Sequence, residues 1–311
     1  MFLGAVTTQA QITIGGNIYG GGNAGDMTGK TSVVIRSADI DGSVFGGARQ
    51  ANVGGSTFVN IDGNHMSGDI LINYVYGGND IAGTIGQSDE VPADLTKATE
   101  YGVNEQCNAF VLTTQERMVT TGEGPDAETT QPYKIFIGQL FGGGNGDYDY
   151  PESPVDGKYV AKSGDETIAT SLTPFVKPET DRVYIEMRGG SCVILYGGGN
   201  NVTVREATDI CIDNPSTITD NVYERDENGQ ETTTSKLTDQ RLKNMGVYDL
   251  SNAGSVDQGV ATSPDYQFSR VFGGNNKADM AIRPKWHLEK GKIRNLYSGG
   301  NHGAMTHLQK E

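Results

Sequence analysis

One short phrase recurs through this sequence: an aliphatic residue, an aromatic residue, two or three glycines and, in most copies, an asparagine. The fullest form is LYGGGN at 195–200, and related copies begin at residues 18, 44, 75, 140, 271 and 296. The shortest separations between successive aromatics are 25 and 26 residues, which gives the length of the repeating unit. A repeat of this length predicts a fold made of stacked copies of one small unit. The aromatics are Tyr19, Phe45, Tyr76, Phe141, Tyr196, Phe272 and Tyr297.

The sequence between the copies is typical of β-strands. Thr31, Val33 and Ile35 alternate with other residues, and the same pattern returns 26 residues later in TFVNI at 57–61. Alternation with period two, broken by glycine, asparagine and aspartate, indicates short strands and turns. One such unit cannot bury its apolar face, whereas stacked units can. We therefore predict an all-β fold, a right-handed parallel β-helix or solenoid with coils of about 25 residues.

The glycines of the phrase predict a sharp corner in every coil. Glycine supplies positive φ and allows close backbone approach, and asparagine tolerates the left-handed region. Stacking of identical coils predicts one ladder of aromatic side chains before the corner and one ladder of asparagines after it. The phrase is therefore interpreted as a structural corner and not as a ligand-binding loop.

The longer gaps between copies predict three loop insertions, near 80–132, 146–182 and 213–268, within a single β-helix domain over 11–311. The insertions contain 28 acids and 10 bases, a charge of −18, so that a net charge of −15 leaves +3 on the coils. In the third insertion, the spacing of apolar residues over 237–245 predicts a short helix. Residues 1–10 resemble the remnant of a secretory signal peptide, and an ordinary first strand is the alternative.

Composition and motifs disfavour several classes of function. The net charge of −15 predicts no nucleic-acid partner, and no apolar run reaches the roughly 18 residues of a transmembrane helix. AGDMTGKT at 24–31 resembles a phosphate-binding loop, but a strand pattern follows it where such a loop needs a helix. Cys192 and Cys211 lie in strand-like runs and are interpreted as buried thiols, with a disulfide between them as the alternative.

Two kinds of chemical site are left open. Asp39 and Asp41 on one coil, with Asp62 at the matching position of the next, are candidate catalytic acids of a β-helical polysaccharide lyase or glycoside hydrolase. Solvated turn residues beside Gly42 and Gly63 are the favoured alternative. Asp147 and Asp149, in the run GGGNGDYDY, are candidate ligands for calcium, which binds carboxylate and carbonyl oxygens. No other cofactor is predicted.

The recurring phrase, with T-x-V-x-I strands between its copies, resembles the glycine-rich repeat proteins that Gram-negative bacteria export to their surface, many of them adhesin-like β-solenoids. The resemblance covers most of the chain outside the insertions. It implies an extracellular or cell-surface location and a non-enzymatic role in which loops are presented for adhesion or for matrix or glycan interaction. The expected partner is a glycan or another protein at the cell surface. No oligomeric state and no site residue follow from the resemblance.

Overall fold

The computed structural model describes residues 11–103, 106–122, 127–216, 223–225, 231–235, 241, 266–304 and 306. The first ten residues lie outside the described part, and so does the expected helix over 237–245 apart from Arg241. The described chain is all-β, and its one named helix is the short 3-10 helix η1 (Gly63–His65).

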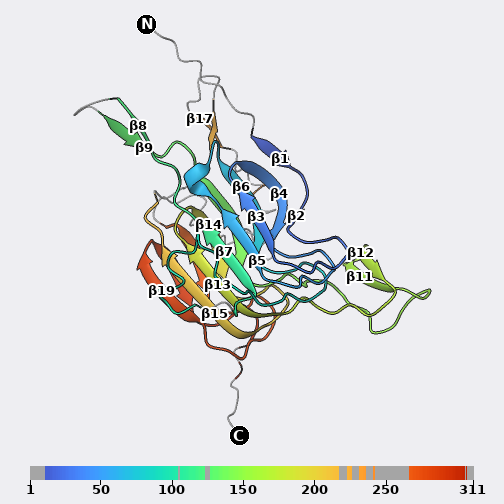
Figure 1. Cartoon of the computed structure of the whole chain (residues 1–311). Helices are drawn as coiled ribbons and strands as arrows, with labels where there is room; N and C mark the ends of the chain where they lie inside the picture. Colours follow the sequence, from blue (N-terminus) through green and yellow to red (C-terminus); the bar gives the residue numbers. More distant parts are fainter. Residues whose placement is uncertain are drawn as a thin grey trace.

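Two sheets form the body of the molecule, and every strand pair within them is parallel (Figure 1). The first sheet contains β1 (Ile12–Ile14), β2 (Ile18–Tyr19), β4 (Ala38–Phe45), β6 (Ile70–Tyr76), β10 (Ile135–Phe141), β14 (Ser191–Tyr196), β18 (Phe268–Phe272) and β20 (Ile293–Tyr297). The second contains β3 (Thr31–Ile35), β5 (Thr57–Ile61), β7 (Ala109–Thr113), β13 (Thr180–Met187), β15 (Val204–Asp213) and β19 (Lys285–Lys290). After β2 the chain alternates strictly between these two sheets.

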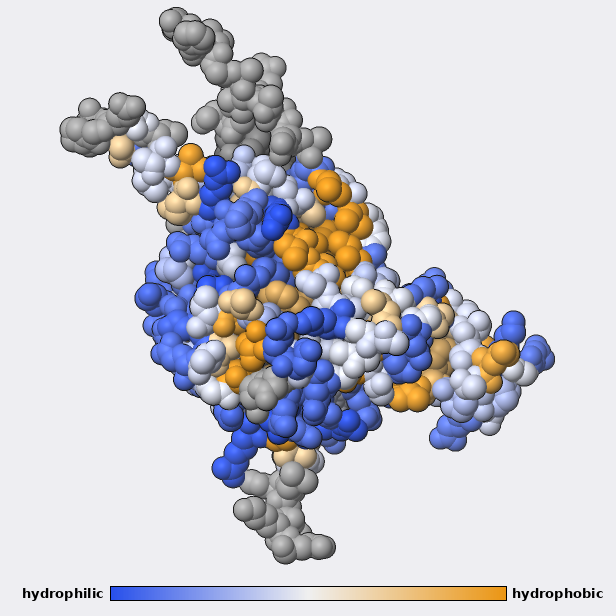
Figure 2. Space-filling model, viewed as in Figure 1, coloured by the Kyte–Doolittle hydropathy of each residue, from blue (hydrophilic) through white to orange (hydrophobic). Residues whose placement is uncertain are grey.

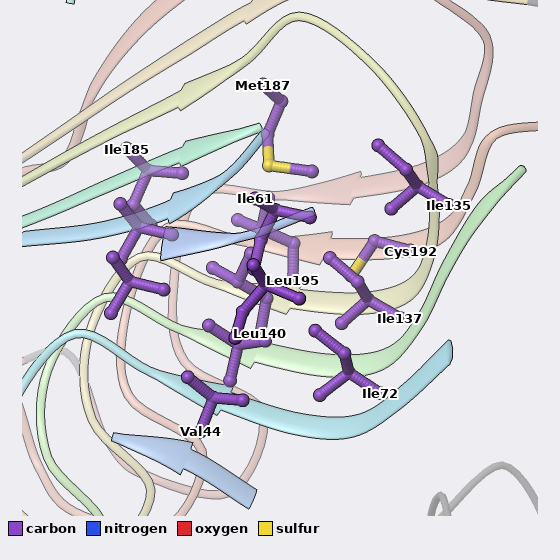
Figure 3. Packing of buried hydrophobic residues seen from close by; sticks show 14 of the residues in the cluster. Val44, Ile61, Ile72, Ile135, Ile137, Leu140, Ile185, Met187, Cys192 and Leu195 are labelled. Atoms are coloured by element: carbon purple, nitrogen blue, oxygen red, sulfur yellow. The ribbon is translucent and has the colours of Figure 1, made fainter. Parts of the chain in front are cut away.

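The space between the two sheets holds the main hydrophobic core (Figure 3). In β3, Thr31, Val33 and Ile35 are buried while the residues between them are exposed, as expected for a strand with one face on a core. Ile72, Ile137 and Cys192 from the first sheet lie in the same cluster as Ile61 and Ile185 from the second. Apolar side chains at alternate positions of the strands thus form one continuous interior.

The predicted aromatic ladder is confirmed. The aromatics of the seven copies occupy matching register positions along the first sheet. Successive rings are stacked, with centroids 4.6–5.1 Å apart and planes within 6–12° of parallel. Tyr19 and Tyr297 end the ladder, and the five rings between them are buried. Stacked aromatics contribute about 0.5–1.5 kcal/mol per pair beyond the area that they bury.

The predicted asparagine ladder is also confirmed, with two substitutions. The Nδ2 amides of Asn301, Asn276 and Asn200 each donate to the Oδ1 of the preceding member, at 2.9–3.0 Å. The series continues through Asn145, whose amide donates to Asp80 at 2.9 Å. Arg49 takes the next position in the series and donates to Asn23 at 3.1 Å. Every member of this ladder is a planar polar group, and hydrogen bonds join the repeats from Asn301 to Asp80 and from Arg49 to Asn23.

Asp80 is a buried carboxylate at which the hydrogen bonds of the ladder converge. The hydroxyls of Tyr19 and Tyr148 donate to it at 2.8 and 2.7 Å, in addition to the amide of Asn145. Burial raises the pKa of Asp80 above its ordinary value, although these three donors and the charge of Arg49 act in the opposite direction. The cost of burying the carboxylate is thus partly offset by three donors from two separate segments.

Of the two reasons expected for the glycines, positive φ is wrong and close backbone approach is confirmed. None of the glycines in the seven copies, all of which are described, has a positive φ. What requires them is the approach of neighbouring repeats, because a Cβ on Gly142 or on Gly197 would lie 2.5 Å from a carbonyl oxygen of the following copy. The equivalent positions Gly20, Gly46 and Gly77 show the same collision with a carbonyl oxygen. Side chains are therefore excluded from the corner by stacking and not by backbone conformation.

The expected bounds of the insertions need correction. The first, 80–132, contains β7, which pairs with β5 and β13 and belongs to the second sheet. The second ends inside β13, whereas the third runs from the last residue of β15 to the first residue of β18, as predicted. Outside the two sheets, the described part of the insertions includes antiparallel hairpins: β8 (Val119–Thr121) with β9 (Glu128–Thr130), β11 (Tyr159–Ser163) with β12 (Glu166–Ser171), and β16 (Tyr223–Arg225) with β17 (Glu231–Ser235).

The cysteines are buried and free. Cys192 lies in β14 of the first sheet and Cys211 in β15 of the second, and neither forms a disulfide. Burial raises the pKa of the Cys107 and Cys211 thiols to about 12. The interpretation of Cys192 and Cys211 as buried thiols is confirmed.

Replacement of Gly198 by valine tests the stacking requirement. A Cβ there would collide with Oδ1 of Asn275, the atom that accepts the amide hydrogen of Gly199 at 2.9 Å. We expect Gly198→Val to lower the free energy of unfolding by about 1–3 kcal/mol, as overpacking does, measured by urea denaturation. Gly25→Val is the matched control, because no atom lies within 4 Å of its Cβ position. Equal losses in the two variants would contradict the steric role of the corner.

The aromatic ladder gives a second prediction. Phe141, in the middle of the ladder, is 1% exposed, whereas Tyr297 at its end is 44% exposed. We expect Phe141→Ala to destabilise the protein by about 3–5 kcal/mol, as for other buried phenylalanines, and Tyr297→Ala by less than half as much. Urea denaturation of both variants measures the difference. A similar loss for both would mean that burial within the ladder does not contribute to stability.

Candidate functional site

The second insertion projects from the side of the two sheets as the hairpin β11–β12 (Figure 1). Its base is fixed by two tyrosines that follow the fourth glycine corner. Tyr148 donates to the buried Asp80, and the hydroxyl of Tyr150 donates to the carbonyl oxygen of Ile81 at 2.6 Å. Ala161 and Ala169 of the hairpin are buried in a small cluster with Ile81. A small apolar cluster therefore packs the hairpin against the repeats.

This insertion exposes large apolar side chains. Leu172 is 79% exposed, Val155 64% and Val176 58%. Figure 2 shows apolar surface among polar residues on the lobe that the insertion forms. Single exposed apolar residues are common on soluble proteins, but three on one projecting segment are typical of a contact surface.

A cleft of about 250 Å³ lies between this insertion and the corner loops of the sheets. Its insertion side includes Thr170, Thr173 and Phe175, and its scaffold side includes Gln50 and Asn52. Backbone contacts hold the two sides together, since the amide of Gly83 donates to the carbonyl of Val176 at 2.9 Å. Clefts between a scaffold and an insertion are common places for ligand sites.

Hydrogen bonds fix the polar side chains on the scaffold side of the cleft. The backbone amide of Asn52 donates to Oδ1 of Asp26 at 2.8 Å, and its side-chain amide donates to Oδ2 at 3.1 Å. These two bonds hold the pKa of the Asp26 carboxyl below its usual range. Oδ1 of Asn52 accepts from the amide and hydroxyl of Thr84 at 2.9 and 3.1 Å. By contrast, Oε1 of Gln50 is buried without a hydrogen-bond partner among the described residues.

The three candidate catalytic acids lie at two different sheets and pair with different basic residues. Asp39 and Asp41 belong to β4 of the first sheet, and both pair with Arg241, Asp39 at 2.8 Å. Asp62 follows β5 of the second sheet and pairs with Arg36 and His65, each at 2.9 Å. Burial tends to raise the pKa of Asp62, but the bonds from Arg36 and His65 outweigh it and hold the pKa below its ordinary value. Each acid is therefore compensated locally.

The candidate calcium ligands lie at the base of the second insertion. Oδ1 of Asp147 accepts from the Asn201 amide at 3.1 Å, and its Oδ2 pairs with Lys277. Asp149 forms an antiparallel bridge with Lys162 through its backbone. No cluster of three or more potential metal ligands occurs in the described part of the chain. Calcium at Asp147 and Asp149 stays a prediction.

The loop that resembles a phosphate-binding motif leads into a strand, as expected from the repeat. Thr31 is the first residue of β3, and its hydroxyl donates to the carbonyl oxygen of Gly46 at 2.6 Å. Lys30 pairs with Glu90 and lies 3.8 Å from Asp89. The helix N-terminus that would face a phosphate is therefore replaced by a strand.

Comparison with known proteins gives no relative: no family model, curated protein or solved structure matches this chain. Among the described residues, no helix has the length and apolarity needed to cross a membrane.

The residues of the cleft were not identified from the sequence. Gln50 and Asn52 follow the one copy of the phrase in which arginine replaces asparagine, and that departure from the repeat was the available signal. Phe175 is 125 residues away along the chain from Gln50, so that no spacing rule joins them.

Proposed function

We propose that the two sheets belong to a right-handed parallel β-helix, and that the chain is part of an exported, extracellular or cell-surface protein. In this proposal the protein is non-enzymatic and presents loops for adhesion, to a glycan or to another protein. Parallel strands that alternate between two sheets, with neighbouring repeats in register, support the β-helix. The resemblance of the glycine phrase to exported repeat proteins supports the location.

One observation carries the proposed role. The second insertion is rigidly mounted through Asp80 and Ile81, yet it exposes Leu172, Val155 and Val176. A scaffold that holds apolar side chains in water at defined positions is expected to bind a partner with them, because preorganised contacts lose less entropy on binding. The separate pairing of Asp39, Asp41 and Asp62 gives the enzymatic alternative no comparable support.

The exposed apolar residues give a direct test. We expect the double variant Val155→Ser, Leu172→Ser to bind about tenfold more weakly to immobilised glycans or matrix proteins, because central apolar contacts carry most binding energy. Leu288→Ser is the matched control, since Leu288 is 52% exposed on β19, away from the insertion. Unchanged adhesion of the double variant, or an equal loss in the control, would contradict the proposed role of the insertion.

The enzymatic alternative has its own test. Incubation of the wild-type chain with a panel of acidic and neutral polysaccharides is expected to release neither reducing ends nor unsaturated products. Release that disappears in Asp39→Asn or Asp62→Asn would replace the proposal by a lyase or hydrolase with these residues in its site.

A further inference from the structure

The cleft between the second insertion and the corner loops has the chemistry of a sugar site. It combines planar polar side chains, Gln50 and Asn52, with the hydroxyls of Thr170 and Thr173 and the ring of Phe175. Amides and hydroxyls both donate and accept hydrogen bonds, as the hydroxyls of a sugar require. An aromatic ring gives the apolar face of a pyranose a surface on which to pack.

We propose that this cleft binds one uncharged sugar ring of a glycan. Its volume of about 250 Å³ is below the roughly 300–1,000 Å³ of sites for drug-sized ligands, and it suits a single ring. The amides of Gln50 and Asn52 on the scaffold side and the hydroxyls of Thr170 and Thr173 on the insertion side are among the polar groups that line it.

Charge sets the class of sugar. The one ionisable side chain among the described residues that line the cleft is Asp26, and no lysine or arginine lines it. Asp26 stays ionised, because the two donors from Asn52 stabilise its carboxylate. A uronic acid or a sulfated sugar would bring a second negative charge to a site without a cation, and like charges disfavour binding. The cleft therefore selects neutral over anionic rings.

This inference rests on the proposed role in adhesion and specifies the ligand of the same insertion. It uses different residues, since Gln50 and Phe175 line the cleft whereas Val155 and Leu172, exposed on the same insertion, do not. The two ideas can therefore fail separately.

The test compares sugars that differ only in charge. Saturation-transfer NMR on the full chain is carried out with glucose against glucuronic acid and with galactose against galacturonic acid at pH 7. We expect transfer to at least one neutral sugar and at least tenfold weaker transfer to its uronic acid. Equal transfer to both members of each pair, or no transfer to either neutral sugar, would overturn the proposal.

Three variants locate the site. Gln50→Leu and Thr173→Val remove single polar groups, and each is expected to weaken neutral-sugar binding at least fivefold. Phe175→Ala should abolish it, and Gln50→Leu keeps the test decisive if the loss of Phe175 from its small cluster impairs folding. Leu288→Ser, the control, should leave sugar binding unchanged, because Leu288 lies on β19 and does not line the cleft. Sugar binding that survives all three cleft variants would place the site elsewhere and overturn the proposal. Loss of adhesion in the Val155 and Leu172 double variant without any sugar binding would leave the proposed function standing with a protein as its partner.

Discussion

The architecture depends on how closely the backbones of successive repeats approach at the glycine corners. A Cβ at Gly197 would lie 2.5 Å from the carbonyl oxygen of Gly273, so the corner has no room for a side chain. With that approach permitted, the residues on either side come into register. The aromatic rings then stack at 4.6–5.1 Å, and the asparagine amides lie 2.9–3.0 Å from their acceptors. One steric constraint thus sets both ladders and the pairing of the first sheet.

The same stacking positions the residues to which the second insertion, the candidate binding surface, is attached. The third copy of the phrase carries Asp80 where most copies carry asparagine, and this carboxylate accepts hydrogen bonds from Tyr19 and from Tyr148 of the second insertion. The second copy carries Arg49 at the matching position, and Gln50 and Asn52 of the cleft follow it. The two departures from the repeat therefore coincide with the place where the insertion attaches. The regular copies form the scaffold, and the two irregular copies contact the second insertion through Asp80 and Arg49.

The sequence predicts the ladders because identical residues at a fixed period must meet when units stack. It does not predict the insertions equally well. The phrase marks strands of the first sheet only, so β7, with the sequence AFVLT at 109–113, was assigned to a loop although it pairs with β5 and β13. Positive φ is expected at the corner because glycine permits it. Contacts with the next repeat, and not φ, exclude side chains from the corner. The cleft was missed because Gln50 and Phe175 meet only through tertiary structure.

Cysteine cross-linking between neighbouring repeats tests the in-register stacking most directly. Asn200 and Asn276 are 76 residues apart in the sequence, yet their side chains are hydrogen bonded at 2.9 Å. The variant Asn200→Cys, Asn276→Cys is oxidised under native conditions, and its peptides are identified by mass spectrometry. The account predicts a disulfide between these two positions and none in the control variant Asn200→Cys, Asn301→Cys, where one repeat lies between the cysteines. Absence of the first disulfide in folded protein, or equal formation of both, would contradict the stacking on which every other conclusion depends.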